Sequence, residues 1–231
     1  NLFKAKPPAY IQTEDGVIVF TDPAFTGVSD AVKLEGIADN IIRVIAAPGK
    51  VLPATESLVT VYSKKPDLTW NTIPSKDSLT LKTKKIVAIV DLKTGAVTFR
   101  DLNGKLILTE KPIGGRCFQS AVFDGSRCYH ITQTFQTTSD DAWYGLGQHQ
   151  DGIMNYRGQQ VIFFQNNTEV AIPFLVSSKN YGILWDNYSL TKAGDVRPLH
   201  PLSSLQLFSK EGEHGWLTAS YANDKNKPED V

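Results

Sequence analysis

Two short polar segments hold most of the side chains in this sequence that could bind a polar ligand. One follows a glycine-rich turn, and the other interrupts an apolar stretch. The candidate rim residues in them are Gln148, His149, Asp151, Asn166, Asn167, Thr168 and Glu169. Such side chains hydrogen-bond sugar hydroxyls, each bond contributing about 0.5–1.5 kcal/mol net. These residue types predict a site for a sugar-like ligand; the alternative is that they satisfy each other and the loop backbone.

No catalytic or metal-binding constellation accompanies these residues in the sequence. The four histidines have no H-x₃₋₅-H spacing and the two cysteines form no C-x₂-C pair, so a metal site has no support. A G-x-S-x-G elbow and a P-loop are also absent. Gly145-Leu146-Gly147 resembles half of a nucleotide-binding loop, but no helical pattern follows it. We therefore predict no catalytic residue, no metal and no cofactor.

Acidic and aromatic residues outside the two segments have ordinary structural interpretations. Asp140-Asp141 is expected to form a solvated loop before a strand, and Asp186 to cap a turn at a strand end. The tryptophans are scattered, and we expect them to pack in sheets rather than form a sugar platform: Trp70, Trp143, Trp185 and Trp216.

Charge and hydropathy exclude several classes of partner. The 231 residues include 24 basic and 24 acidic side chains, and the isoelectric point is about 7.1. A chain without a basic face is a poor candidate for binding nucleic acid or an anionic membrane. No apolar run approaches the roughly 18 residues of a membrane span. The chain begins at Asn1 without a signal-peptide pattern and ends in a polar stretch, so we expect it to be part of a longer protein.

Nearly every segment of the chain has the pattern of a β-strand. Residues 31–37 alternate apolar and polar side chains, whereas residues 86–90 are continuously apolar. Asn103-Gly104 and Asp124-Gly125 can adopt the positive φ angles of tight hairpin turns. The predicted strands are residues 16–20, 31–37, 41–46, 58–62, 79–83, 86–90, 96–100, 105–109, 118–123, 129–137, 161–165, 171–178, 181–187, 202–208 and 215–221. No long amphipathic helix competes with them, so the pattern predicts an all-β fold, an antiparallel β-sandwich.

The two cysteines flank the hairpin that turns at Asp124-Gly125. With a two-residue turn, Cys117 would face Thr132 and Cys128 would face Ala121. Directly opposed residues lie about 4.5–5.5 Å apart, and this offset places the two thiols too far apart for a disulfide. We therefore predict two free, buried thiols; a longer turn would shift the register and permit a disulfide.

The stretch from residue 143 to residue 187 contains WYGLGQHQDG and then NNTEVAIPFLVSSKNYGILWDN. It resembles the N-terminal β-sandwich of glycoside hydrolase family 31, the α-glucosidases and α-xylosidases. The residues that match the family's motifs are Tyr144 to Gly147, Ile172-Pro173-Phe174, Ser177-Ser178 and Tyr181-Gly182. The resemblance covers roughly residues 10–220 and implies a galactose mutarotase-like supersandwich over residues 1–221. It also implies that residues 222–231 are a linker or the start of an inserted PA14-like module.

Two departures from the family pattern point to one branch of it. Gln148 stands where many members have Glu, and residues 166–169 form a shortened version of the family's polar loop. Both departures resemble the α-xylosidases of bacterial xyloglucan degradation. The resemblance therefore implies an oligosaccharide substrate such as a xyloglucan fragment, and a secreted or periplasmic location.

The resemblance implies a non-catalytic role for this chain. The family places two catalytic aspartates on a (β/α)₈ barrel that follows this domain, since retaining hydrolysis needs two carboxylates about 5–5.5 Å apart. One catalytic Asp of that barrel directly precedes a Met, whereas the only Met here is Met154, preceded by Ile153. We therefore expect no turnover by this chain alone. It would pack on the barrel and lend its polar segments to the active-site rim, where the oligosaccharide binds.

Two other functions stay open. A free-standing carbohydrate-binding module would bind xyloglucan oligosaccharides alone, through Trp143 and His149. A mutarotase-like sugar epimerase would need a histidine acid and a glutamate base across a groove, for which His130 and Glu169 are the candidates, although their spacing gives no support. The shared-rim hypothesis requires the bends at residues 145–152 and 166–169 to face a common side.

Overall fold

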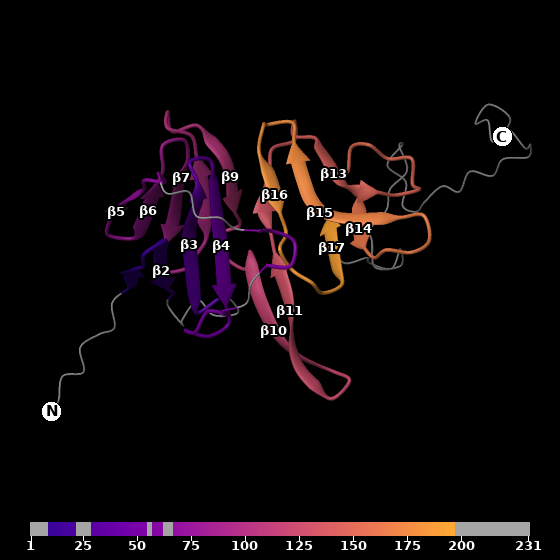
Figure 1. Ribbon diagram of the computed structural model, residues 1–231, viewed down its shortest axis with the longest axis horizontal. Coiled ribbons are helices and arrows are strands. Elements are labelled where there is room, and N and C mark those ends of the chain that lie inside the picture. The colour runs from indigo at the N-terminus through magenta and orange to yellow at the C-terminus, as the bar shows by residue number, and fades with distance from the viewer. Residues whose placement is uncertain (1–8, 22–28, 55–56, 62–66, 197–231) are drawn as a thin grey trace, which may run out of the picture.

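The computed structural model describes residues 9–21, 29–54, 57–61 and 67–196. All the regular secondary structure within these ranges consists of β-strands (Figure 1). The strands are β1 (Tyr10–Gln12), β2 (Gly16–Phe20), β3 (Ala31–Ala38), β4 (Ile41–Ala47), β5 (Asn71–Pro74), β6 (Ser78–Lys82), β7 (Val87–Asp91), β8 (Val97–Arg100), β9 (Leu106–Glu110), β10 (Arg116–Phe123), β11 (Ser126–Gln133), β12 (Phe135–Gln136), β13 (Trp143–Gln148), β14 (Gln160–Phe163), β15 (Val170–Ser177), β16 (Gly182–Leu184) and β17 (Thr191–Gly194). All strand pairs are antiparallel, so the predicted all-β class is confirmed. Among these residues no helix is long and apolar enough to cross a membrane.

The first lobe is a sandwich of two sheets around one apolar core. Four strands in the order β1-β2-β3-β4 form one sheet, and six in the order β12-β9-β8-β7-β6-β5 form the other. Successive residues of a strand point to opposite faces, and the inward ones of both sheets are apolar. The fully enclosed side chains are Val17, Val19, Val32, Leu34, Leu79, Leu81, Ala88, Val90 and Val97. Burying a Val or Leu contributes about 1.5–3 kcal/mol, so this core is the main stabilising element of the lobe.

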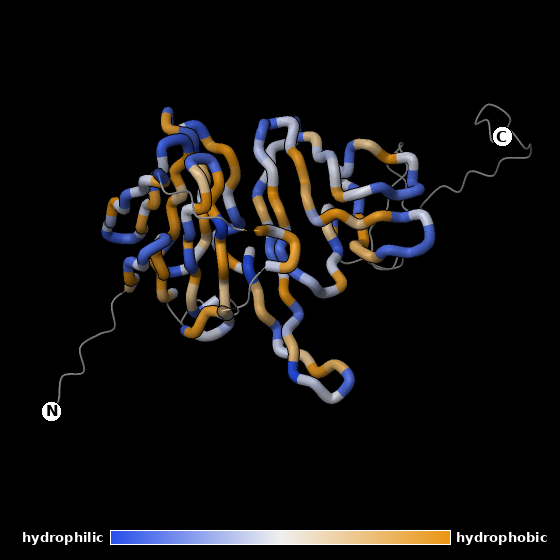
Figure 2. Tube along the Cα trace, viewed as in Figure 1, coloured by the Kyte–Doolittle hydropathy of each residue, from blue (hydrophilic) through white to orange (hydrophobic). Residues whose placement is uncertain are grey.

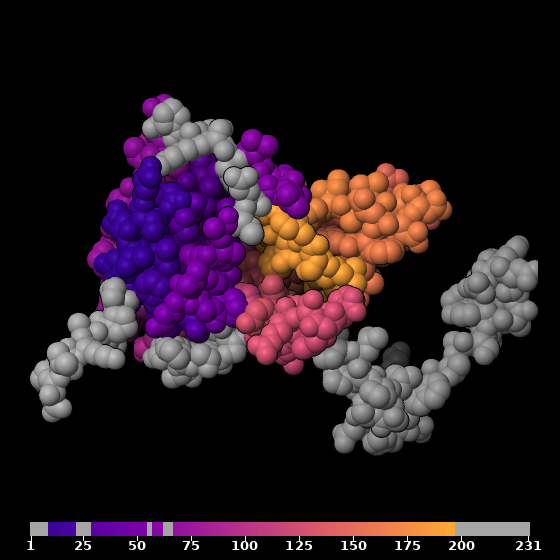
Figure 3. Space-filling view, turned by 60° about the horizontal axis from the view of Figure 1, so that its bottom comes forward, coloured from indigo at the N-terminus to yellow at the C-terminus, as the bar shows by residue number. Residues whose placement is uncertain are grey.

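The second lobe is smaller and more open. The sheet β13-β15-β16 packs on the two-stranded sheet β14-β17. Within the described residues, its buried core consists of Leu146, Tyr156 and Val161. The two lobes touch along part of their sides (Figure 3), where Arg43 Nη2 of β4 lies 3.4 Å from Asp186 Oδ2. Asp186 is predicted as a turn cap, but its carboxylate accepts from Tyr188 OH at 2.8 Å and pairs with Arg43, so it joins the two lobes.

The β10–β11 hairpin projects away from both lobes (Figure 1). Its turn lies at Asp124-Gly125, and the predicted register is confirmed, with Cys117 opposite Thr132 and Cys128 opposite Ala121. Both thiols are free, but the prediction that they are buried is wrong. The Cys117 side chain is half-buried and that of Cys128 is exposed, because no described element covers the faces of the projecting hairpin.

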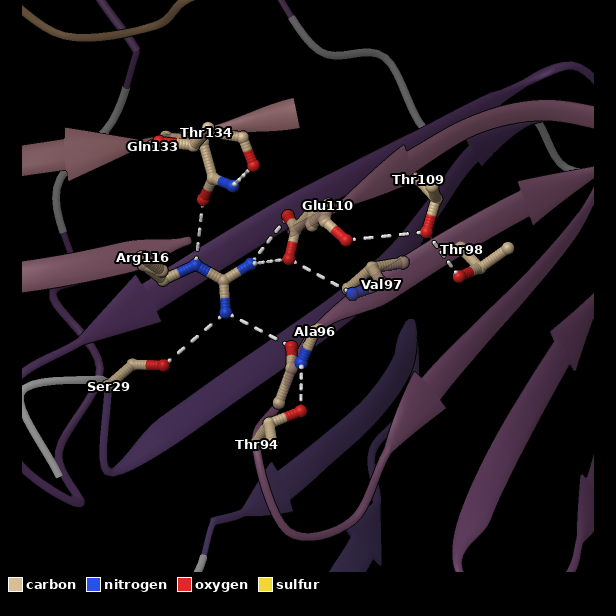
Figure 4. Close-up of polar contacts among 11 residues, drawn as sticks. Ser29, Thr94, Ala96, Val97, Thr98, Thr109, Glu110, Arg116, Gln133 and Thr134 are labelled. Carbon is tan, nitrogen blue, oxygen red and sulfur yellow. Dashed lines mark hydrogen bonds and ion pairs between the residues drawn. The ribbon is translucent and has the colours of Figure 1, made fainter. Parts of the chain in front are cut away.

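A buried ion pair fastens this hairpin to the first lobe (Figure 4). Arg116 Nη2 lies 2.6 Å from both carboxylate oxygens of Glu110, and each of the two side chains is only 5% exposed. Arg116 Nη1 also donates to the Gly95 carbonyl at 3.1 Å, and Glu110 Oε2 accepts from the Val97 amide at 3.0 Å. Burial raises the pKa of Glu110, against the opposing effect of the guanidinium. The pair is enclosed by protein groups, so its role is structural.

Most predicted strands lie within two residues of the observed ones, and residues 16–20 coincide with β2. The predicted strand at 58–62 is wrong, because described residues 57–61 form no strand. The sequence pattern does not predict β1, β5 or β17, which are short and poor in apolar residues. The predicted strands at 202–208 and 215–221, and with them the predicted domain limit at residue 221, lie outside the described residues.

Candidate functional site

The pairing of β13 with β15 brings the two polar segments together. The last residue of β13 lies opposite the first residue of β15, so the segment after β13 and the segment before β15 are neighbours. Gln150 Nε2 donates a hydrogen bond to Thr168 Oγ1 across this gap. His149 Nδ1 lies 3.8 Å from Glu169 Oε2. The two bends therefore lie side by side, which is the arrangement that the shared-rim hypothesis requires.

A β-bulge fixes the course of the first segment. Gly145, Leu146 and Gly147 have φ angles of 95°, 64° and 110°, in the region that favours glycine. A Cβ on Gly147 would lie 1.9 Å from the Val170 carbonyl oxygen, so a larger residue does not fit there. The pairing register shifts here, because three residues of β15, Ile172 to Phe174, lie opposite the single residue Leu146, and the missing N–H of Pro173 is tolerated at this irregularity. The Gly-Leu-Gly motif is thus a bulge within a strand.

An open depression of about 470 Å³ lies beside the second segment. Its lining residues are Gln150, Ile162, Phe164, Asn166, Asn167, Thr168, Glu169 and Leu190. Residues 166–169 are all predicted rim residues, whereas Gln148, His149 and Asp151 do not line the depression. Exposed Ile162 and Phe164 add an apolar wall. A polar bend against an apolar wall is the usual composition of a small-molecule site.

Asn166 and Asn167 present the open amides of this depression. Both are exposed, and neither side chain makes a hydrogen bond to any other described residue. Asn167 has a φ angle of 54°, which Asn tolerates better than most residues. The Glu169 amide donates to the Asn166 carbonyl at 3.1 Å and closes the turn. Each side-chain amide therefore offers free donors and a free acceptor to a ligand.

The His149 ring is enclosed, whereas Asp151 is exposed and uses one carboxylate oxygen to hold its own turn. The His149 side chain is 7% exposed, its Nε2 lies 3.0 Å from the Leu146 carbonyl oxygen, and its ring meets the edge of Tyr156 at 6.1 Å. Asp151 Oδ1 accepts from the Ile153 amide at 3.0 Å. These two residues satisfy the loop itself, so direct contact with a ligand stays a prediction for them.

The remaining aromatic candidate in this region is covered on one side. The guanidinium carbon of Arg157 lies 5.6 Å from the centroid of the Trp143 ring, over its face. Arg157 is held there by a hydrogen bond from Nη1 to the Asp141 carbonyl at 3.1 Å. A sugar cannot stack on that face of Trp143 while the guanidinium occupies it.

Asp141 is not part of a solvated loop, and that prediction is wrong for it. The residue is 4% exposed, and its carboxylate accepts hydrogen bonds from Ser177 Oγ at 2.5 Å and Tyr181 OH at 2.8 Å. Burial alone would raise the pKa of Asp141, but these bonds outweigh it and lower that pKa. Burial and the carboxylate raise the pKa of Tyr181 to about 12. Asp140 is exposed and pairs with Lys179, as a solvated residue does.

Neither a metal site nor an epimerase pair can be assembled from the residues that the structure describes. No group of three His, Cys, Asp or Glu side chains there could hold a metal ion. His130 lies in β11 of the projecting hairpin, opposite Gln119, whereas Glu169 precedes β15 in the second lobe. His130 does not line the depression that contains Glu169, so these two residues do not face each other across it.

The fold and motifs have counterparts among known proteins. The profile of the family described as "Glycosyl hydrolase 31 N-terminal galactose mutarotase-like domain" matches residues 31–192. An α-xylosidase of Saccharolobus solfataricus is 32% identical over a 175-residue alignment, which covers 69% of this chain and 22% of that protein. An uncharacterized family 31 glucosidase of Pseudescherichia vulneris is 27% identical over 187 residues, covering 70% of this chain and 34% of that protein.

Solved structures agree with these relatives. The family 31 α-xylosidase of Xanthomonas citri is 38% identical with a TM-score of 0.73, and the match covers 89% of this chain and 22% of that one. A soil-metagenome family 31 α-xylosidase complexed with xylose shares the fold at 23% identity and a TM-score of 0.66. This chain therefore spans about a fifth to a third of the length of these relatives. It belongs to glycoside hydrolase family 31, in which it corresponds to the N-terminal galactose mutarotase-like domain.

Proposed function

We propose that this chain is the non-catalytic N-terminal domain of a retaining α-xylosidase or α-glucosidase that acts on oligosaccharides such as xyloglucan fragments. Two relatives above 30% identity are named α-xylosidases, and this chain spans 22% of each. The rest of each relative's length is sufficient for a catalytic barrel. The domain packs on that barrel and contributes the bends at residues 148–151 and 166–169 to the rim of its active site.

The pair of free amides in an open depression is the observation that carries this proposal. Asn166 and Asn167 offer donors and acceptors to sugar hydroxyls, while Ile162 and Phe164 offer an apolar wall to the face of a sugar ring. The depression is too open to enclose a ligand alone. A second domain that completes the rim would explain why the polar site is enclosed on only one side in this chain.

Substitution of Asn166 in the full-length enzyme tests the rim role. We expect Asn166→Ala to lower kcat/KM for a xyloglucan oligosaccharide about 2- to 12-fold, because one hydrogen bond of about 0.5–1.5 kcal/mol is lost. An aryl α-xyloside has no sugar beyond the cleaved bond, so its kcat/KM should be unchanged. Asn166 is preferred over Asn167 as the target, because the positive φ of Asn167 would add backbone strain.

The control for this experiment is Asn71→Ala, at an exposed position of β5 in the other lobe. It should leave both substrates unaffected. Equal kinetics of the Asn166→Ala and Asn71→Ala enzymes on the oligosaccharide would show that the depression takes no part in substrate binding.

We also propose that the full-length enzyme is secreted or periplasmic, and that residues 222–231 lead into a linker or an inserted PA14-like module. Both proposals rest on the resemblance of Gln148 and the shortened loop to α-xylosidases of xyloglucan degradation. Fractionation of the source cells, followed by detection with an antibody against this chain, tests the location. Detection in the cytoplasmic fraction alone would contradict it.

A further inference from the structure

The central strand of the second lobe is apolar on both of its faces. β15 reads VAIPFLVS, and its inner side places Leu175 against the small core. The outer side consists of alternate residues, which are Val170, Ile172, Phe174 and Val176. A strand with one face in water alternates apolar and polar residues, whereas a continuously apolar strand is typical of burial on both faces. The sequence of β15 is therefore that of a strand with a further layer over it.

Neighbouring strands extend this apolar surface. Tyr144 of β13 lies opposite Val176, and Leu184 of β16 lies opposite Phe174. Directly opposed side chains point to the same face of a sheet. The outer face is defined by these residues: Tyr144, Val170, Ile172, Phe174, Val176 and Leu184. Each is between 39% and 49% exposed, and β15 is orange for most of its length in Figure 2.

Gly182 makes the outer face continuous. A Cβ at this position would lie 2.9 Å from Cζ of Phe174, so the phenyl ring occupies the space that a side chain would need. None of the six residues of the outer face is charged. Contiguous exposed apolar patches of this kind mark surfaces that another protein surface covers.

We propose that the outer face is the surface on which the catalytic part of the same polypeptide docks, through an apolar, uncharged surface of its own. This inference rests on the proposed function. The relatives of this chain are several times longer, since it spans only 22% of the two α-xylosidases. A covalently linked segment is present at a high effective concentration, which favours it over a second copy as the occupant.

The outer face adjoins the rim, which supports the same occupant. Val170 directly follows the rim residue Glu169, and Gln148 lies opposite Val170, so the Gln148 side chain points to the side of the outer face. A domain docked on this face would therefore meet Gln148 and stand next to the bend at residues 166–169.

Photocrosslinking of the full-length enzyme tests this assignment. Ile172→p-benzoylphenylalanine places a photoreactive group on the outer face, and Val176→p-benzoylphenylalanine provides a second site if the first variant fails to fold. The control is Lys85→p-benzoylphenylalanine, in the exposed turn between β6 and β7 of the other lobe. After irradiation and proteolysis, mass spectrometry identifies the captured peptides. We expect both outer-face sites to capture peptides of the catalytic barrel, downstream of residue 231 of the same polypeptide, about tenfold more than the control; capture of peptides from a linker or an inserted module instead would contradict the proposal.

The other outcomes overturn the proposal. Capture of a second copy, seen as a dimer-sized band on a denaturing gel, would make the outer face a self-association surface. Capture of residues 197–231 would show that this chain covers its own face, and no capture at either site would leave the face free. The kinetics of Asn166→Ala are independent of these results. Downstream capture with unaltered kinetics would retain the docking surface and reject the rim role.

Discussion

The buried carboxylate of Asp141, two residues before β13, accepts hydrogen bonds from Ser177 at the end of β15 and from Tyr181 just before β16. Its pKa is lowered by hydrogen bonds from Ser177 and Tyr181, against the effect of burial. A depressed carboxyl pKa contributes stability that is fully present above the ordinary value of 3.8 and is lost as pH falls through the lowered pKa. We expect Asp141→Asn to cost about 1–3 kcal/mol of unfolding free energy at pH 7 and to flatten the acid-side decline. Urea unfolding at pH 7, 4 and 3 measures both. Asp140→Asn, at an exposed neighbour, should leave the free energy of unfolding almost unchanged, and equal effects of the two variants would contradict the buried role of Asp141.

Residue types located the polar bends but did not separate open side chains from enclosed ones. Asn166 and Asn167 are open, whereas the His149 ring is enclosed because its partners, the Leu146 carbonyl and Tyr156, come from the surrounding fold. Phe164 lines the depression, but the sequence does not predict it as a site residue, because an apolar residue within an apolar run is typical of a buried core. Only the absence of a covering layer among the described residues, which no local pattern encodes, leaves it exposed.

Among the strands, the sharpest prediction concerns the register shift at Gly145 to Gly147 of β13. Gly147→Ala should destabilise the chain by at least about 2 kcal/mol, because Ala disfavours the φ angle of 110° and its Cβ would lie 1.9 Å from the Val170 carbonyl oxygen. Gly152→Ala is the matched control, since Gly152 also has a positive φ angle, 68°, but nothing lies within 4 Å of its added Cβ. It should cost about 1 kcal/mol. Urea denaturation compares the two variants, and equal losses would show that the close approach to Val170 does not matter.

Strand positions could be predicted from alternating apolar and polar residues and from turn residues such as Asn-Gly wherever the strand packs on a second layer. The first lobe was predicted well for this reason, since burial along β3 alternates almost as its sequence does. The failures have other causes. The sequence of β13 is typical of a glycine turn, because Gly145 and Gly147 lie at the register shift within this strand. The strand predicted at residues 58–62 fails because its described residues pair with no described strand. Pairing partners are a property of the whole chain, so local patterns cannot supply them.

The molecule as a whole has one strong core and one weak one. Among the described residues, nine fully enclosed apolar side chains form the core of the first lobe, whereas three buried apolar side chains form the core of the second, whose outer face is exposed. Contact between the lobes includes the partly exposed Arg43–Asp186 pair, and pairs of this kind contribute only about 0–1 kcal/mol. The lobes should therefore open separately, the second at a lower free energy than the first.

Hydrogen exchange of the isolated chain and of the full-length enzyme tests this division. In the isolated chain, amides of β14 and β15 should exchange at least about tenfold faster than those of β3 and β7, which corresponds to a difference of about 1.4 kcal/mol in opening free energy. In the full-length enzyme, a domain docked on the outer face would slow exchange in β15 and leave β7 unchanged. Uniform exchange across both lobes of the isolated chain would mean that they unfold as one unit.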